Sequence, residues 1–235
     1  MNVIDSTIIG YVNHFSRHSW VFDRSLELLA SNRLLKGGIL IAIVWWLWFK
    51  KDELQPDNRQ HIVVTFIGCV VGMIVARVLS LMLPFRLRPI HEEGSGFILP
   101  YGVSPAVLDG WSSFPSDHAV LFFALSAGLL FISRKAGMIA LCYTAVCIAF
   151  PRIYLGMHYP TDIIVGAMIG VMIALLANGY LVKVTPLKKM TDWSYSSPNI
   201  FYPFLFLFSY QVADMFDNSR ALLRAGLKLF QAIFN

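Results

Sequence analysis

The stretch FPSDHAVLFFALSAGLLFIS, residues 114–133, places Ser116, Asp117 and His118 directly before a run without any charged residue. Three other blocks are similarly apolar: 62–83, interrupted only by Arg77, then 136–151 and 163–182. Apolar blocks of roughly 18 to 22 residues are typical of transmembrane helices. The stretch therefore predicts a polytopic membrane protein with a polar cluster at the mouth of one helix.

The composition supports this interpretation. Of the 235 residues, 57% are hydrophobic and 14% are charged, whereas soluble domains carry about a quarter charged residues. Outside the termini no basic stripe with interleaved aromatic residues is present, which argues against a nucleic-acid partner. The three cysteines, Cys69, Cys142 and Cys147, lie in apolar blocks without the spacing of a metal or redox site. We expect no metal and no cofactor.

We predict an all-α bundle of five to six transmembrane helices in three segments. Residues 1–36 have the pattern of an amphipathic interfacial helix, and residues 217–235 that of an amphipathic tail. Between them, residues 37–216 should form the transmembrane catalytic domain, whose core is 62–181. The pattern leaves open whether 199–215 forms a sixth span. The oligomeric state is also open.

The charges of the loops predict the orientation of the bundle. Lysine and arginine are concentrated in the loops 50–60, 134–135 and 183–189, and are fewer in the loops 84–113 and 151–159. By the positive-inside rule the first group faces the cytoplasm. We therefore expect a bacterial inner membrane protein whose polar cluster faces the periplasm or the cell exterior.

Three short clusters share that outer side: PFRLRP at 84–89, FPSDH at 114–118 and PRIYLGMHYPTD at 151–162. Together they supply arginines, histidines, a serine and aspartates. Arginine binds phosphate oxygens, one histidine can attack phosphorus, another can protonate the leaving oxygen, and a carboxylate can orient the attacking ring. This set of residues indicates phosphoryl transfer.

The spacing assigns positions to these residues. Pro160 is suited to the first position of a helix, so that His158 lies just before it and Asp162 about one turn after His158. We expect Asp162 to hold one ring nitrogen of His158. Pro115 likewise predicts a helix start, whose first amides, from Ser116 onward, would form a phosphate site.

These motifs resemble the signature of the type 2 phosphatidic acid phosphatase (PAP2) superfamily, K-x6-R-P, P-S-G-H and S-R-x5-H-x3-D, over about 62–181. The matching residues are Arg88 and Pro89, then Pro115, Ser116 and His118, then Arg152, His158 and Asp162. The resemblance implies a membrane lipid phosphatase in which His158 is the nucleophile, His118 the general acid and Asp162 the third catalytic residue. It also implies that Arg88, Arg152, Ser116 and Asp117 bind the substrate phosphate.

Three departures from the signature matter. Leu81 stands where the family has lysine, and Arg77 or Arg86 is a candidate substitute, although Arg77 could equally pair with a neighbouring helix. Pro151 replaces the serine of the third motif. Asp117 replaces glycine, as in the branch that resembles undecaprenyl pyrophosphate phosphatases.

The sequence thus favours hydrolysis of a lipid phosphate or diphosphate, with undecaprenyl diphosphate as the first choice, through a phosphohistidine. Phosphatidic acid or phosphatidylglycerol phosphate phosphatase activity, and phosphotransfer to another lipid, remain alternatives. A channel or transporter is disfavoured because the polar groups cluster at helix ends and not along a path through the membrane.

Overall fold

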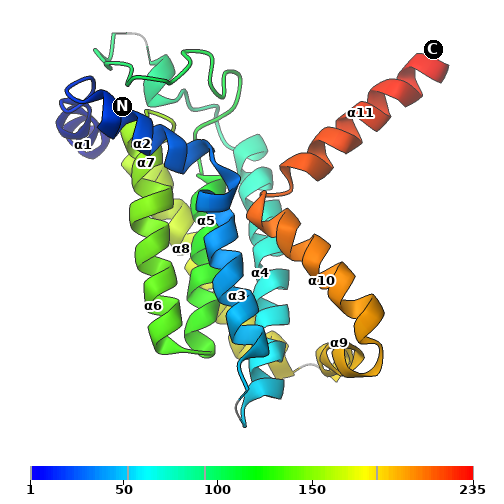
Figure 1. Ribbon diagram of the computed structural model, residues 1–235. Helices are drawn as coiled ribbons and strands as arrows, with labels where there is room; N and C mark the ends of the chain where they lie inside the picture. The colour runs from blue at the N-terminus through cyan, green and yellow to red at the C-terminus, as the bar shows by residue number, and fades with distance from the viewer. Residues whose placement is uncertain (1, 52, 93, 184, 235) are drawn as a thin grey trace.

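The computed structural model describes residues 2–51, 53–92, 94–183 and 185–234, and the regular structure in these ranges is helical (Figure 1). The prediction of an all-α membrane bundle is confirmed. The α-helices are α1 (Val3–Asn13), α2 (Trp20–Ser31), α3 (Ile39–Phe49), α4 (Gln55–Met82), α5 (Asp117–Gly128), α6 (Arg134–Tyr143), α7 (Phe150–Tyr154), α8 (Pro160–Tyr180), α9 (Thr185–Ser196), α10 (Pro198–Ala213) and α11 (Asp217–Phe234). Short π or 3₁₀ turns join some of them: η1 (Leu34–Gly38), η2 (Pro89–His91), η3 (Leu129–Phe131), η4 (Thr144–Ala149) and η5 (Leu181–Lys183).

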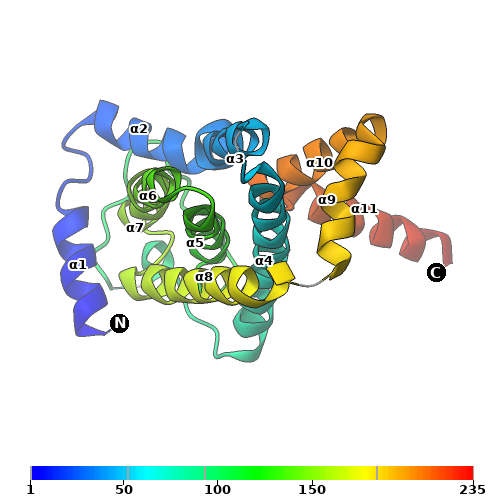
Figure 2. The same cartoon turned by 90° about the horizontal axis from the view of Figure 1, so that it is seen from below.

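Helix α5 is the centre of the bundle. Figure 2 shows it enclosed by α4, α6 and α8, and its residues 119–122 and 124–128 are buried, as expected for a helix that is apolar on all sides. Small residues let α8 approach it closely. A Cβ atom on Gly170 would lie 2.3 Å from the carbonyl oxygen of Val120, and one on Gly166 would lie 2.7 Å from that of Ser116. This packing brings the start of α8 beside the start of α5.

Three helical stretches have the length and composition to cross a membrane: α4, Arg134–Tyr154 and Pro160–Lys183. Helix α2 and the stretch Leu34–Phe49 form a pair bent by 67°, which counts as a fourth span if it is taken as one. The apolar helix Asp117–Phe131 is shorter. Each of these stretches overlaps an apolar block of the sequence, and the expected number of five to six spans stays a prediction. Helix α10 has 16 residues and contains Pro203, and it runs obliquely beside α4 in Figure 1.

The N-terminal segment differs from the single amphipathic helix that we expected. It forms two helices, because the chain turns at Arg17, which has a φ of 64°, and α2 begins anew where the Ser19 hydroxyl accepts a hydrogen bond from the amide of Phe22. Both helices lie across one end of the bundle (Figure 1). Their aspartates Asp5 and Asp23 are fully buried there. The segment is therefore packed into the protein, and its polar side chains contribute to that packing.

The C-terminal helix α11 extends away from the bundle (Figure 1). Leu222, Leu223 and Leu227 are exposed on it. An exposed apolar face of this kind suits a helix that lies in the membrane interface, so the interfacial tail stays a prediction.

Candidate active site

The ring of His158 is buried in the loop between α7 and α8, with 2% of its surface exposed. Its Nδ1 atom lies 2.9 Å from the carbonyl oxygen of Ser113. A carbonyl only accepts, so Nδ1 carries the proton and Nε2 keeps its lone pair. Nε2 lies 3.2 Å from Nη1 of Arg88, which only donates. His158 therefore presents a lone pair beside a guanidinium.

Burial also favours the neutral ring. The loss of water around His158 lowers its pKa below the ordinary value, and the neighbouring charge of Arg88 lowers it further, while Asp162 acts in the opposite direction. A neutral imidazole is the form that can act as a nucleophile.

Asp162 lies near His158 but is held mainly by other groups. Its Oδ2 atom is 3.7 Å from Nδ1 of His158, which is too long for a hydrogen bond. It accepts from the amide of Tyr159 at 2.8 Å and from the hydroxyl of Ser113. Arg86 donates to its other oxygen, Oδ1, at 2.5 Å. The expected direct contact is thus replaced by Ser113, whose hydroxyl binds Asp162 while its carbonyl orients His158.

Arg88 is held rigidly in the site. Only 5% of its surface is exposed, and it donates to three backbone carbonyls, those of Trp111 at 3.2 Å, Ser112 at 3.1 Å and Met157. These bonds fix its guanidinium against His158, as a preorganised cation for phosphate oxygens requires.

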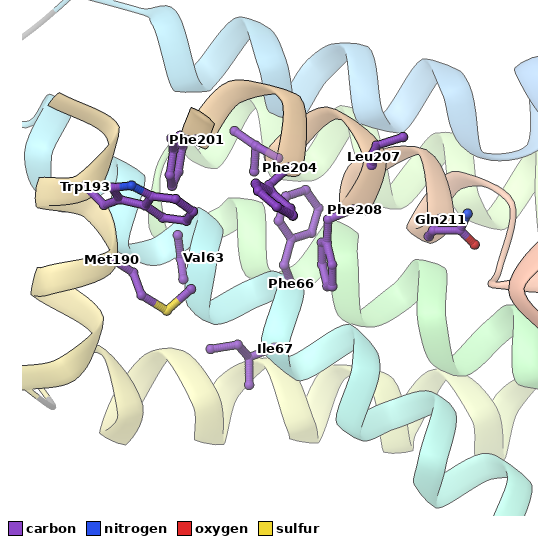
Figure 3. A pocket seen from close by; sticks show the side chains of 11 residues that line it. Val63, Phe66, Ile67, Met190, Trp193, Phe201, Phe204, Leu207, Phe208 and Gln211 are labelled. Carbon is purple, nitrogen blue, oxygen red and sulfur yellow. The ribbon is translucent and has the colours of Figure 1, made fainter. Parts of the chain in front are cut away.

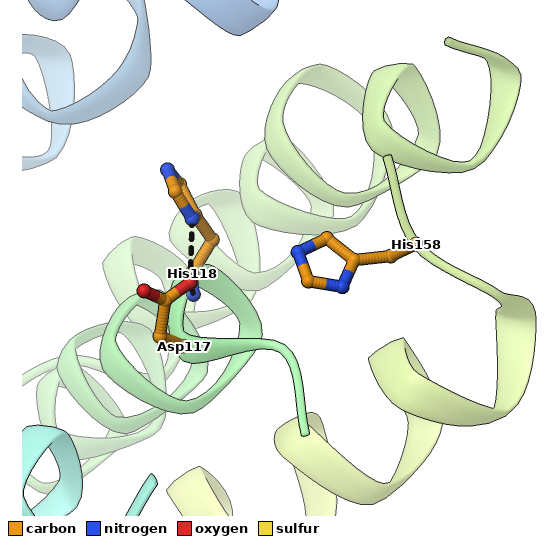
Figure 4. Close-up of side chains that lie close together, drawn as sticks. All are labelled: Asp117, His118 and His158. Atoms are coloured by element: carbon orange, nitrogen blue, oxygen red, sulfur yellow. Dashed lines mark hydrogen bonds and ion pairs between the residues drawn. The ribbon is translucent and has the colours of Figure 1, made fainter. Parts of the chain in front are cut away.

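Asp117 and His118 form a pair at the first turn of α5, and His158 faces them from the opposite side (Figure 4). Nδ1 of His118 lies 2.9 Å from Oδ1 of Asp117, so the carboxylate accepts from Nδ1–H. Nε2 of His118 is buried, and none of the described residues forms a hydrogen bond to it. This nitrogen is available to a group that the protein itself does not supply.

Arg77, one of the two candidate substitutes for the family's lysine, reaches the site from α4. Its Nη2 atom is 3.8 Å from Oδ2 of Asp117, and its guanidinium stacks 4.7 Å from the ring centre of Trp111. Leu81, at the position of the family's lysine, is 78% exposed and contributes no polar group. The structure thus assigns Arg77 to the cluster.

Arg86, the other candidate substitute, is committed elsewhere. It lies between two buried carboxylates, with Nη2 2.6 Å from Asp5 and Nη1 2.5 Å from Asp162. Its guanidinium also stacks on the ring of Tyr159 at 4.2 Å. Arg86 therefore ties the N-terminal helix α1 to the start of α8, and its charge is already balanced.

Three of the amides at the mouth of α5 already have partners, in contrast to the open amide site that we expected. The helix begins at Asp117, with Ser116 as the cap whose hydroxyl accepts from the amide of Ala119. The amide of Ser116 donates to the carbonyl of Asp162 at 3.3 Å, and that of His118 donates to the Asp117 carboxylate at 2.8 Å. Pro115 precedes the helix and does not open it. The Asp117 carboxylate thus occupies a position suited to an anion.

Arg152 is 4% exposed and lies at the end of the helical stretch that η4 and α7 form. It donates from Nη2 to the carbonyl oxygen of Ala30 at 3.2 Å. Its Nε atom is buried and has no hydrogen-bond partner among the described residues. Arg152 therefore keeps one buried N–H that no described residue accepts.

The hollow among these residues is small, with a volume of about 20 Å³, about the space of one water molecule. It is lined by Ala76, Arg77, Ser80, Arg88, Trp111, Ser112, Pro115, Asp117 and His158. A phosphate group is larger than this hollow, so side chains that line it must move when the substrate binds.

One group in the described part of the chain has the ligand types of a metal site. Asp117, His118 and His158 each offer one ligand atom within 4.8 Å of the others. The same closeness is needed when two histidines act on one phosphorus centre. The two interpretations predict different responses to chelators and to zinc.

Two residues that organise the site, Ser113 and Asp5, were not among those predicted from the sequence. Ser113 belongs to none of the motifs. Its contacts with His158 and Asp162 appear only when the chain is folded. Asp5 belongs to an N-terminal helix that is remote in sequence, and it also accepts from the amide of Thr161 at 3.0 Å. In the sequence Asp5 is one polar residue of an amphipathic segment, and nothing local to it indicates that it is buried.

A larger hollow lies between the first half of α4, α9 and α10, away from the end of α4 that carries Arg77 (Figure 3). Its volume is about 450 Å³, and Phe66, Trp193, Phe201 and Phe208 are among the residues that line it. Apart from the indole nitrogen of Trp193 and the amide of Gln211 its side chains are apolar (Figure 3). It suits hydrocarbon packing and lacks the groups that catalysis requires.

The chain is similar to known proteins over the region that holds most of these residues. Residues 83–186 match the model of the PAP2 superfamily. The chain is 23% identical over 169 residues to undecaprenyl-diphosphatase BcrC of Bacillus subtilis, covering 72% of this chain and 80% of the relative. It is 29% identical over 154 residues to the putative undecaprenyl-diphosphatase YbjG of Escherichia coli. This alignment covers 66% of this chain and 71% of the relative.

A solved structure has a similar fold. The transmembrane PAP2-type phosphatidylglycerolphosphate phosphatase of Bacillus subtilis aligns with a TM-score of 0.50 at 22% identity, covering 77% of this chain and 86% of the other. The likeness supports the helical membrane architecture.

Proposed function

We propose that this membrane protein, whose residues 83–186 match the PAP2 superfamily model, hydrolyses a polyprenyl diphosphate such as undecaprenyl diphosphate. The observation that carries the proposal is the ring of His158. Its protonated Nδ1 is fixed by Ser113, and its Nε2 lone pair lies 3.2 Å from Arg88. The two named undecaprenyl-diphosphatases support the choice of substrate.

In the first step, Nε2 of His158 attacks the terminal phosphorus and an N–P bond forms. The bond between that phosphorus and the bridging oxygen breaks, and the lipid monophosphate leaves with a proton from Nε2 of His118. Arg88, Arg152 and Arg77 neutralise the phosphate oxygens during this step.

In the second step, a water molecule attacks the phosphohistidine. His118, now neutral, takes a proton from the water as the N–P bond breaks, and inorganic phosphate is released. Asp117 stabilises the protonated form of His118, which gives its proton in the first step and is formed again in the second, because its carboxylate accepts from Nδ1 at 2.9 Å.

We propose further that the protein lies in a bacterial inner membrane with this site on the outer side. The arrangement of basic loops supports this orientation. The N-terminal helices lie at the same end of the bundle as the site, so they would share that compartment.

The direct test is an assay of the purified protein in detergent. We expect phosphate release from undecaprenyl diphosphate at a higher kcat/KM than from phosphatidic acid or phosphatidylglycerol phosphate, and none from the His158→Ala variant. Adding a second lipid with a free hydroxyl distinguishes transfer from hydrolysis, since a transferase would phosphorylate that lipid. Preference for a glycerolipid phosphate would contradict the proposed substrate, and absence of phosphate release or transfer with any lipid would contradict the enzyme class.

A further inference from the structure

A hollow of about 300 Å³ lies beside the active site, between the second half of α4 and the elbow 214–216, where α10 turns into α11. Its walls are apolar except for two guanidinium groups. The lining residues are Val70, Met73, Ile74, Arg77, Val78, Phe216 and Arg220. Apolar walls with a few charged groups are typical of ligand sites. This hollow suits a molecule that has both a hydrocarbon part and an anionic part.

Arg77 joins this hollow to the active site. The same side chain also lines the small hollow that Asp117 and His158 line. A second connection is Trp111, which belongs to the small hollow as well. The guanidinium of Arg77 lies 4.7 Å from the centre of its ring, and that of Arg224, on α11, lies 6.0 Å from it. The C-terminal segment therefore reaches the active site, although it lies outside the residues 83–186 that match the family model.

The elbow is a fixed wall of this hollow. Met215 and Phe216 have φ angles of 56° and 59°, a conformation that persists in residues with a side chain only where the surrounding structure holds it. The amide of Phe216 donates to the carbonyl of Gln211 at 2.8 Å, and the amide of Asn218 donates to the carboxylate of Asp214 at 3.0 Å. Met215 is fully buried. These contacts hold the ring of Phe216 against α4.

The hollow continues along one face of α4, away from Arg77. The α4 residues that line the larger apolar hollow are Val63, Phe66 and Ile67, and they share a face with the residues at 70, 73, 74 and 77 because of their spacing. The opposite wall is also continuous, since Phe66 packs on Phe208 at 5.5 Å and Phe208 packs on Phe216 at 6.1 Å (Figure 3). From 63 to 77 this face is about 21 Å long at 1.5 Å per residue. We call the two hollows together the α4 groove.

We propose that the α4 groove seats the lipid tail of the substrate, so that the C-terminal segment is part of the substrate site. When a phosphate is bound by Arg77 and Arg88, the tail that leaves it enters the hollow beside Arg77. Arg220 lines the same hollow and supplies a further cation for the lipid-linked phosphate. It pairs with Asp217, and its buried Nε atom has no hydrogen-bond partner among the described residues.

The groove acts by orienting the substrate. Membrane hydrocarbon is as apolar as the groove, so the tail gains little free energy by moving from one to the other. A tail held along α4 instead fixes the direction from which the phosphate meets His158. Small errors in such positioning are costly, because a displacement of about 1 Å can lower the rate by about 100-fold.

This inference rests on the proposed function, and its test blocks the groove at two depths. Ile74, 58% exposed, lines the hollow beside Arg77, and Ile67 lines the larger one. We expect Ile74→Trp to lower kcat/KM by about 10- to 100-fold for both undecaprenyl diphosphate and the short geranyl diphosphate. Ile67→Trp should impair only undecaprenyl diphosphate, whose tail reaches that depth. Neither variant should lose activity on a water-soluble aryl phosphate, which has no tail.

The matched control is Val71→Trp. Val71 lies on the same helix, is 43% exposed and lines neither hollow, so kcat/KM should stay unchanged for all three substrates. If Ile74→Trp lost as much activity on the aryl phosphate as on the diphosphates, or lost none on any substrate, the inference would be wrong. The phosphatase proposal would stand in both cases, because its failure would appear in the wild type.

A second measurement does not require turnover. In the His158→Ala variant without native cysteines, a membrane-permeant maleimide should label Ile74→Cys. Undecaprenyl diphosphate at ten times its Kd should slow this labelling by about 10-fold, by mass action, and should not affect Val71→Cys. Equal protection by phosphatidylcholine would assign the groove to bulk membrane lipid, and no protection by the diphosphate would place the tail elsewhere. Either result would overturn the inference.

Discussion

The Nδ1 atom of His158 lies 2.9 Å from the carbonyl oxygen of Ser113 and 3.7 Å from the carboxylate of Asp162. The backbone therefore fixes the tautomer of the ring, and Asp162 acts on it indirectly. The carboxylate instead holds Ser113, Arg86 and the capping turn at Tyr159. The carbonyl of Ser113 thus orients the reactive ring of His158, whereas Asp162 stabilises the loops around that ring.

That division predicts different effects for two variants. His158→Ala should remove essentially all turnover, because no other group replaces the nucleophile. Asp162→Asn should keep a measurable phosphoenzyme burst but lose about 1–3 kcal/mol of unfolding free energy, since a buried hydrogen-bonded charge is lost. Rapid-quench kinetics with a ³²P-labelled substrate and thermal unfolding measure the two effects. If Asp162→Asn also lacked a burst at unchanged stability, Asp162 would itself be the orienting group.

His118 should show its role through the leaving group. His118→Ala should lower kcat by about 10²- to 10⁴-fold on a lipid phosphate monoester, and much less on an aryl phosphate with an acidic phenol, which leaves without a proton. A lipid diphosphate should be intermediate. The measurement is kcat for the three substrates in the wild type and the variant. Equal losses on all three would assign His118 to binding and not to proton transfer.

The environment of His158 predicts its titration. Burial and the charge of Arg88 lower its pKa, which disfavours the protonated ring, so the neutral form should persist below the ordinary histidine pKa of about 6.5. Activity that depends on its lone pair is therefore retained as the pH falls through that value and lost only in more acidic solution. NMR of ¹⁵N-histidine protein in detergent, assigned with His158→Ala, reports this pKa directly. A value at or above the ordinary one would contradict the prediction.

Metal ions should inhibit and should not be required. Arginines already supply the positive charge that phosphoryl transfer needs, so EDTA should leave activity unchanged. Zinc should inhibit, because Asp117, His118 and His158 bring three ligand atoms within 4.8 Å and binding would occupy the nucleophile. Asp117→Asn should weaken zinc inhibition. Loss of activity with EDTA and recovery with Mg²⁺ would falsify the metal-free mechanism.

The orientation can be tested by cysteine labelling. In a background without Cys69, Cys142 and Cys147, we expect a cysteine at the exposed Ser95 to react with impermeant thiol reagents in intact cells. A cysteine at Val3, which is 81% exposed, should react from the same side, because α1 contacts the site through Asp5 and Arg86. A cysteine at Lys135 is the control and should react only after lysis. The reverse pattern would invert the topology.

The amino-acid sequence alone was enough to predict the helical membrane bundle and to single out His118, His158, Asp162, Arg88 and Arg152. Both results come from local properties. Apolar blocks of membrane length can satisfy their backbone hydrogen bonds only within a helix, and motif spacing places side chains relative to a helix start.

Contacts between distant segments decided the rest, because they depend on how the helices pack. Ser113 meets His158 and Asp162 where α5 and α8 approach through Gly166 and Gly170, and Asp5 meets Arg86 where α1 packs against the end of the bundle. The direction of Arg77 also depended on a partner, Asp117, from another helix. The spacing of residues in the sequence predicts a single helix and its caps. Whether a charged side chain is buried, and which groups it contacts there, depends on the distant segments that the fold packs against it.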